Sequence, residues 1–196
     1  MLQRAKAVIG AVMILACGGL ATGQAQAPQA PAPTPDVVYV GTPYDVVSKM
    51  LKLGKVTSKD VVYDLGCGDG RMIVLAAKKY GCRGVGYDID PERVEAAQAN
   101  VKRNGTEHLV QIFRKDIFTI DLSEADVLLL YLLEDLDKKL LPQLERLKPG
   151  SRVVCHNYGI PGIEADAVIR VMSNEDSARH TMFLYTTPLK AVSSGQ

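Results

Sequence analysis

Residues 61–71 read Val-Val-Tyr-Asp-Leu-Gly-Cys-Gly-Asp-Gly-Arg, and the architecture of the chain follows from this stretch. The β-branched run that ends at Leu65 predicts a buried strand, and the apolar spacing that follows predicts a helix ending at Gly81. Three glycines separate the two elements: Gly66, Gly68 and Gly70. Glycine lets a backbone turn sharply and approach a ligand closely. Such a turn is a weak signal by itself, because it also occurs without any ligand.

The remaining chain alternates short apolar runs with amphipathic stretches. Strands are predicted over 60–65, 83–88, 109–113, 126–133, 151–156, 167–172 and 181–186. Helices are predicted over 43–53, 71–80, 91–104 and 135–147. Alternating strands and helices indicate a parallel sheet covered on both faces, and the last two strands follow one another without a helix. We therefore expect an α/β fold, with a doubly wound, mostly parallel seven-strand sheet and a C-terminal antiparallel hairpin.

Carboxylates come at the ends of the first three strands of the pattern. Asp64 closes the first, Asp88 follows Gly66 by 22 residues, and Asp116 precedes Ile117 after the third. Ligands bind such sheets at the carboxyl ends of the strands. Asp64 suits an ammonium group, Asp88 suits ribose hydroxyls, and Asp116 with Ile117 suits the amine and face of adenine. S-adenosylmethionine (SAM) carries all three groups, although each acid taken alone also reads as an ordinary surface carboxylate.

A nicotinamide-dependent dehydrogenase shares the first two features. Its fingerprint is Gly-x-Gly-x-x-Gly or Ala. Here Arg71 stands at the third place, and Gly70 comes one residue early. Asp64 and Asp116 also favour SAM over a nicotinamide cofactor.

Together these motifs resemble those of class I SAM-dependent methyltransferases, and the resemblance covers residues 37 to about 187. A narrower similarity is to small single-domain protein-lysine methyltransferases, of the archaeal broad-specificity type and the mitochondrial type that modifies the ATP synthase c subunit. It rests on the segments 39–47, 62–71, 125–133 and 147–154. The resemblance implies methylation of a lysine ε-amino group of a protein. It also implies that Thr42 and Pro43 close over SAM, with a looser lid because Gly41 replaces a frequent proline.

Three residues are candidates for roles on the acceptor side, each with an alternative interpretation. Tyr131, after the fourth strand, is expected to form the wall of the acceptor channel, or else to be a core tyrosine. His156, after the fifth strand, is a candidate for moving a proton, or else a structural histidine. Glu134 is a candidate for steering an incoming ammonium, or else a solvated acid at the start of a helix. No cysteine spacing suggests a metal site.

Other functions remain open at this point. A small-molecule O- or N-methyltransferase uses the same fold but usually adds insertions that enclose the substrate, and this chain has few. A non-catalytic module that binds SAM or a partner is the alternative outside enzymes, and the intact glycine turn with its acids argues against it.

Charge and composition point to no nucleic-acid partner. The 196 residues are 47% hydrophobic with a net charge of +1. Without residues 1–35 the chain has 21 basic and 22 acidic residues, a net charge of −1. We expect a monomeric domain that acts on a protein and has no nucleic-acid ligand.

The N-terminus predicts export or membrane attachment. Residues 1–23 combine Arg4, Lys6, an apolar run and small residues, as in a signal peptide or membrane anchor. Cys17 also suggests a lipoprotein box, and a buried N-terminal helix is the alternative. Residues 24–36, rich in Gln, Ala and Pro, read as a linker, residues 37–190 as the domain, and residues 191–196 as a flexible tail. If the N-terminus is not functional, the enzyme is cytoplasmic, where SAM is made.

Overall fold

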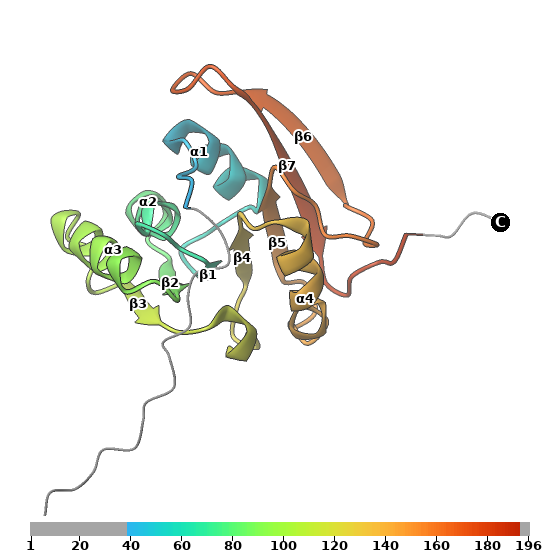
Figure 1. Cartoon of the computed structure of the whole chain (residues 1–196), viewed down its shortest axis with the longest axis horizontal. Coiled ribbons are helices and arrows are strands. Elements are labelled where there is room, and N and C mark those ends of the chain that lie inside the picture. The colour runs from blue at the N-terminus through green and yellow to red at the C-terminus, as the bar shows by residue number, and fades with distance from the viewer. Residues whose placement is uncertain (1–38, 193–196) are drawn as a thin grey trace, which may run out of the picture. The chain divides into compact units, whose positions relative to one another are not determined.

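The computed structural model describes residues 39–192. Its helices are α1 (Tyr44–Leu53), α2 (Arg71–Tyr80), α3 (Pro91–Arg103), the short 3-10 helix η1 (Ile117–Thr119) and α4 (Glu134–Leu144) (Figure 1). Its strands are β1 (Val61–Leu65), β2 (Arg83–Asp88), β3 (Val110–Arg114), β4 (Val127–Leu130), β5 (Arg152–His156), β6 (Ala167–Met172) and β7 (Arg179–Thr186).

The strands form one seven-stranded sheet in the order β3-β2-β1-β4-β5-β7-β6. The first five strands of that order are parallel, and β7 lies antiparallel between β5 and β6. The predicted seven-strand sheet with a C-terminal antiparallel hairpin is thus confirmed. Strand order reverses between β1 and β4, which opens a crevice at their carboxyl ends.

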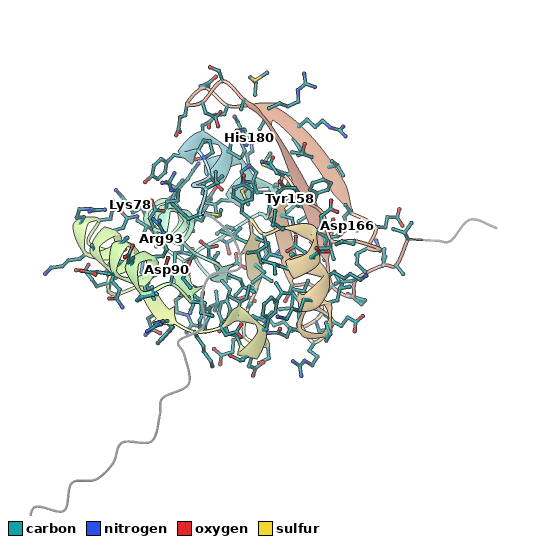
Figure 2. All side chains as sticks on the ribbon, viewed as in Figure 1. Lys78, Asp90, Arg93, Tyr158, Asp166 and His180 are labelled. Carbon is teal, nitrogen blue, oxygen red and sulfur yellow. The ribbon has the colours of Figure 1, made fainter. Side chains whose placement is uncertain are left out.

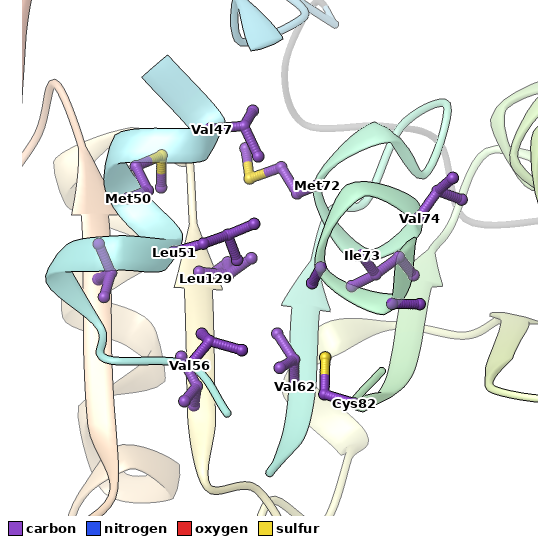
Figure 3. Packing of buried hydrophobic residues seen from close by; sticks show 14 of the residues in the cluster. Val47, Met50, Leu51, Val56, Val62, Met72, Ile73, Val74, Cys82 and Leu129 are labelled. Atoms are coloured by element: carbon purple, nitrogen blue, oxygen red, sulfur yellow. The ribbon is translucent and has the colours of Figure 1, made fainter. Parts of the chain in front are cut away.

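Helices cover the two faces unequally. α1, α2 and α3 pack on one face, where alternate residues of the central strands, such as Val62 and Leu129, point toward them. Figure 3 shows this cluster, with Val47, Met50, Leu51, Met72 and Ile73 labelled. The opposite face, which includes Tyr63 and Leu128, is covered by α4 and the η1 region. The described residues between β5 and β6 contain no helix.

Two predicted elements end three residues too late, while the other predicted bounds differ from the observed ones by at most two residues. β4 ends at Leu130 rather than at residue 133, because its neighbour β1 turns away after Leu65, the partner of Leu130. Tyr131 therefore follows β4 and stands at the crevice. α4 ends at Leu144 rather than at residue 147, and its last residues pass through hydrogen-bonded turns such as Leu147 N–H to the Leu144 carbonyl, 3.2 Å.

The domain extends beyond the predicted boundary at residue 190. Ala191 forms a β-bridge with Ile163, and the Val192 N–H donates to the Gly162 carbonyl at 2.9 Å. The start of the predicted flexible tail is thus ordered. The predicted signal or anchor segment, the linker and residues 193–196 lie outside the described residues. Within residues 39–192, no helix has the length and apolar character needed to cross a membrane.

Candidate active site

A cavity of about 300 Å³ lies at the carboxyl ends of β1, β2 and β4. Its walls come from four loops that follow strands, from the start of α2 and α3, and from residues 39–42. Six of the predicted site residues line it: Thr42, Gly66, Asp88, Asp116, Ile117 and Tyr131. The structure therefore brings together side chains from positions 42 to 131, as expected for the carboxyl edge of a parallel sheet.

The glycine turn between β1 and α2 requires its glycines. Gly66, Gly68 and Gly70 have φ values of 75°, 54° and 72°, in the left-handed region that other residues rarely adopt. At Gly68, an added Cβ would lie 1.9 Å from Cε2 of Tyr39. The tyrosine ring thus packs directly on the turn. No side chain larger than hydrogen fits there without moving Tyr39.

Asp64 is a buried carboxylate with one unpartnered oxygen. It lies at the end of β1, and among the described residues its Oδ2 has no hydrogen-bond partner. Burial, followed by the negative charges of Asp88 and Asp69, raises the pKa of Asp64 to about 8. A buried acid in this state gains from a cationic partner. Asp64 does not itself line the cavity, but it lies two residues before Gly66, which does, so it suits a ligand that carries an ammonium group at the glycine turn.

Asp88 is fixed by backbone donors on both sides. Its Oδ2 accepts the Gly68 N–H at 2.9 Å, and its Oδ1 accepts the Asp90 N–H at 3.0 Å. These bonds join the end of β2 to the glycine turn. They hold the carboxylate at the cavity wall, where remaining lone pairs can accept ligand hydroxyls.

Asp116 caps η1 beside the same cavity. Its Oδ1 accepts the Phe118 N–H at 2.9 Å. Ile117 and Phe118 add apolar wall, and the Lys139 ammonium lies 3.7 Å from the centre of the Phe118 ring on η1. An acid next to a flat apolar surface suits an aromatic base that carries an amine.

Residues 39–42 close one side of the cavity and are tied to α2. Nη1 of Arg71 donates to the Thr42 carbonyl at 3.1 Å, while the guanidinium pairs with Asp69 at 2.7 Å. A Cβ at Gly41 would meet the Arg71 guanidinium at 2.5 Å. Gly41 thus makes room for the arginine that fastens this segment, whereas the resemblance implied a looser lid.

A series of hydrogen-bonded side chains, most of them buried, connects Thr42 of this segment to β5 and β7. Oγ1 of Thr42 lies 3.0 Å from Nδ1 of His156, and Nε2 of His156 lies 2.8 Å from Nδ1 of His180. Nε2 of His180 reaches the Asp176 carboxylate at 3.0 Å. The carboxylate only accepts, so with neutral imidazoles each group donates toward Asp176, beginning with the Thr42 hydroxyl. We call these four residues the Thr-His-His-Asp chain.

His156 does not fit the role of a proton acceptor for a substrate. Both of its ring nitrogens are engaged, and its side chain is 1% exposed. Burial, then the charge of His180, lowers the pKa of His156 to about 4. The structural alternative for His156 is therefore the one that the structure supports.

Tyr131 lines the cavity on the side of β4 and α4, together with Leu132 and Leu136. Its ring centre lies 4.1 Å from that of His156 and 6.5 Å from that of Tyr158, and Nδ2 of Asn157 lies 3.4 Å from its hydroxyl. This placement agrees with a channel wall. A purely internal tyrosine would not line the cavity.

Several residues of the site were not predicted. Tyr39 packs between Gly68 and Arg93, whose guanidinium lies 4.6 Å from the tyrosine ring centre. Figure 2 labels Arg93 and Asp90 at the start of α3. Arg71, His180 and Asp176 were also missed as site residues. Two of them had a sequence signal: Arg71 directly follows the glycine turn, and Tyr39 begins the segment 39–47 that carries part of the resemblance. Among residues 39–192, no three His, Cys, Asp or Glu side chains gather to hold a metal.

Comparisons with known proteins agree with this geometry. Residues 64–167 match the family described as ANTKMT methyltransferase domain. The chain is 44% identical over 153 residues to a protein-lysine N-methyltransferase of Saccharolobus islandicus, covering 77% of this chain and 94% of that protein. It is 38% identical over 95 residues to a ribosomal protein L11 methyltransferase of Shewanella pealeana, covering 48% of this chain and 32% of that protein.

A solved structure extends the match to the ligand. The RNA methyltransferase of Salinibacter ruber, in complex with S-adenosyl-L-homocysteine, is 41% identical with a TM-score of 0.71, covering 76% of this chain and 94% of that one. The glycine turn, the acids at the strand ends and these relatives agree. The chain therefore belongs to the ANTKMT methyltransferase domain family and is a SAM-dependent methyltransferase.

Proposed function

We propose that this enzyme methylates the ε-amino group of lysine in a protein substrate. The support is the similarity to the Saccharolobus enzyme over nearly its whole length, together with the open acceptor side of the cavity. In the described chain no inserted helix covers the cavity next to Tyr131. A large substrate can reach such an opening, whereas a small-molecule enzyme usually encloses its substrate.

Four groups are assigned to the cofactor under this proposal. Asp64 receives the ammonium group, because its buried Oδ2 lacks a partner among the described residues. Asp88 receives the ribose hydroxyls, and Asp116 with Ile117 receives adenine. When bound, SAM supplies an electrophilic methyl group on a positively charged sulfur. The chain holds that group and the acceptor in place, and positioning of this kind lowers a barrier by several kcal/mol.

The acceptor side must deliver an uncharged amine. The ordinary pKa of lysine is about 10.4, so the ammonium has to lose a proton before attack. The apolar surroundings of Tyr131, which include Leu132 and Leu136, disfavour the charged form. The proton leaves to solvent through the open side, and Glu134, exposed at the start of α4, attracts the incoming cation.

The decisive experiment incubates the full-length chain with methyl-labelled SAM and four acceptor pools: proteins, RNA, small metabolites and buffer. Labelled methyl-lysine in protein hydrolysates supports the proposal. Blocking lysines by acetylation beforehand should remove the label. Label confined to RNA or to small metabolites would refute the lysine assignment and leave the methyltransferase intact. An Asp88→Ala variant, which we expect to bind SAM poorly, serves as the inactive control.

For the N-terminus we propose that residues 1–23 direct export or membrane attachment and that residues 24–36 form a linker. The support is the sequence pattern of a basic start, an apolar run and small residues. Fusion of residues 1–36 to a periplasm-dependent reporter enzyme should give activity, and the enzyme should appear in the membrane or exported fraction. A reporter that stays inactive, with the enzyme in the cytosolic fraction, would contradict this. We also propose a monomer, testable by light scattering.

A further inference from the structure

A groove separate from the cofactor cavity runs along the C-terminal hairpin. Its volume is about 390 Å³. It lies on the face of the sheet that carries α4. The segment from 157 to 166, which joins β5 to β6, has no helix to cover β7 and β6 there. The residues that matter here are Glu134, Ile160, Pro161, Val168, Phe183 and Tyr185.

The floor of this groove is apolar and partly exposed. Val168 on β6 pairs directly with Phe183 on β7, so both side chains stand on the same face. Val168 is 45% exposed, which is high for a valine on a sheet. Leu133 and Tyr158, 47% and 36% exposed, extend the apolar surface beside the groove. A contiguous exposed apolar surface on a folded protein commonly marks an interaction site.

One acid gives the groove a preferred charge. Glu134 is the only charged residue among those that line it. Within residues 39–192, its carboxylate has no ion pair. It begins α4, whose first turn also carries Asp135. A partner that places a cation against an apolar side chain therefore matches both features of the groove.

The groove meets the cofactor cavity at the residues after β4. Leu132 and Leu136 line the cavity, and Glu134 between them lines the groove. On the other side, Tyr158 stacks with Tyr131 and is followed by Gly159 in the groove. Figure 2 labels Tyr158 on the side of the hairpin, away from Asp90 and Arg93. A substrate in the groove is thus adjacent to the opening through which an acceptor enters.

We propose that this groove binds a large aliphatic or aromatic side chain of the substrate protein, a few residues from the target lysine, while Glu134 holds the lysine ammonium before it enters. The inference rests on the proposed lysine methylation and adds a sequence preference to it. The occupant is an unfolded or exposed peptide segment that pairs a lysine with a nearby apolar residue. Glycine- or serine-flanked lysines lack the second contact.

The test uses the full-length chain and a peptide series. One peptide carries a single lysine among glycine and serine, and the others place one leucine at each position within four residues of that lysine. For the wild type, kcat/KM should rise about tenfold or more at one or two leucine positions, since a buried leucine contributes that much affinity. A flat profile across the series overturns the proposal.

Three variants on β6 show whether the groove causes the preference. Val168→Glu places a charge on the groove floor, whereas Ile169→Glu changes the next residue, 40% exposed on the opposite face. The ratio of kcat/KM for the best leucine peptide to that for the glycine-serine peptide should fall toward one in Val168→Glu and persist in Ile169→Glu. Val168→Ala, a milder change, should lower the ratio in part. Equal ratios in all three variants would overturn the proposal.

Glu134 is tested with its neighbour as the control. Glu134→Gln should raise KM for the lysine peptides several-fold with little change in kcat, and Asp135→Asn should change neither. If no lysine peptide or protein is methylated while SAM still binds, the proposed function itself fails. If lysines are methylated without any leucine preference, only the groove assignment fails.

Discussion

Binding of SAM should release a proton from Asp64. The carboxyl is buried, and burial together with nearby acids raises its pKa in the ligand-free chain to about 8. An ammonium group beside it favours the ionised form and lowers that pKa. Affinity should therefore increase as pH rises toward 8 and decrease as pH falls, until pH drops below the pKa of the bound state.

The size of the effect follows from the pKa. At pH 7 about one-tenth of Asp64 is ionised, so the apparent Kd is about tenfold weaker than with full ionisation, a cost of about 1.4 kcal/mol. Each further decrease of one pH unit weakens the apparent Kd by about another tenfold, or about 1.4 kcal/mol. His156, with a pKa of about 4, stays neutral over this range and adds nothing.

Calorimetry separates this effect from others. Titration of SAM at pH 7 in phosphate and in Tris gives different enthalpies, and the difference should correspond to about 0.9 protons released per SAM. Kd is then followed from pH 5.5 to 7, below the ordinary pKa of about 7.7–8.0 of an α-amino group. Asp64→Asn should bind more weakly, release no proton and show no pH slope. A wild-type Kd that is independent of pH, without proton release, would refute the pairing of Asp64 with the ammonium.

Three further outcomes are expected. Gly68→Ala should weaken SAM binding at least about tenfold, because the added methyl group displaces Tyr39 from the glycine turn. Gly150→Ala introduces similar backbone strain, at a φ of 85°, but has open space around it and should leave the Kd for SAM unchanged. Equal effects of the two substitutions on Kd would count against the Tyr39 contact. His180→Ala removes a link of the Thr-His-His-Asp chain, so it should lower the free energy of unfolding by about 1–3 kcal/mol, measured by urea unfolding. Initial rates should show that the variant raises KM for SAM more than it lowers kcat. A loss in kcat alone would instead indicate a role in the chemistry. Burial raises the pKa of Asp137 to about 8, so this group ionises at higher pH in the folded than in the unfolded state and lowers the free energy of unfolding increasingly from pH 4 to pH 8. In urea unfolding, Asp137→Asn should remove this decrease. An equal gain in the free energy of unfolding at pH 4 and at pH 8 would contradict the prediction.

Much of the fold was predictable because its determinants are local. The alternation of short apolar runs with amphipathic stretches identified all seven strands, and Gly81 and Pro91 marked a helix end and a helix start. Strand ends were less predictable. The end of β4 depends on where its neighbour β1 stops pairing, and nothing in residues 126–133 encodes that.

The cofactor side of the site was predictable for a related reason. Parallel strands share one carboxyl edge, so acids at strand ends converge wherever the sheet forms. Asp64, Asp88 and Asp116 are local features of three strands. The topology alone brings Asp88 and Asp116 to one cavity and buries Asp64 two residues before Gly66, which lines it.

The surroundings of that site could not be read from the chain, because they are contacts between segments distant in sequence. His156 resembles a proton acceptor until folding places it between Thr42, 114 residues away, and His180 on the antiparallel hairpin. The groove exists because one face of the sheet lacks a helix beside β6. Sequence periodicity tells which residues are buried, whereas the partner of each buried polar group depends on how the whole sheet is assembled.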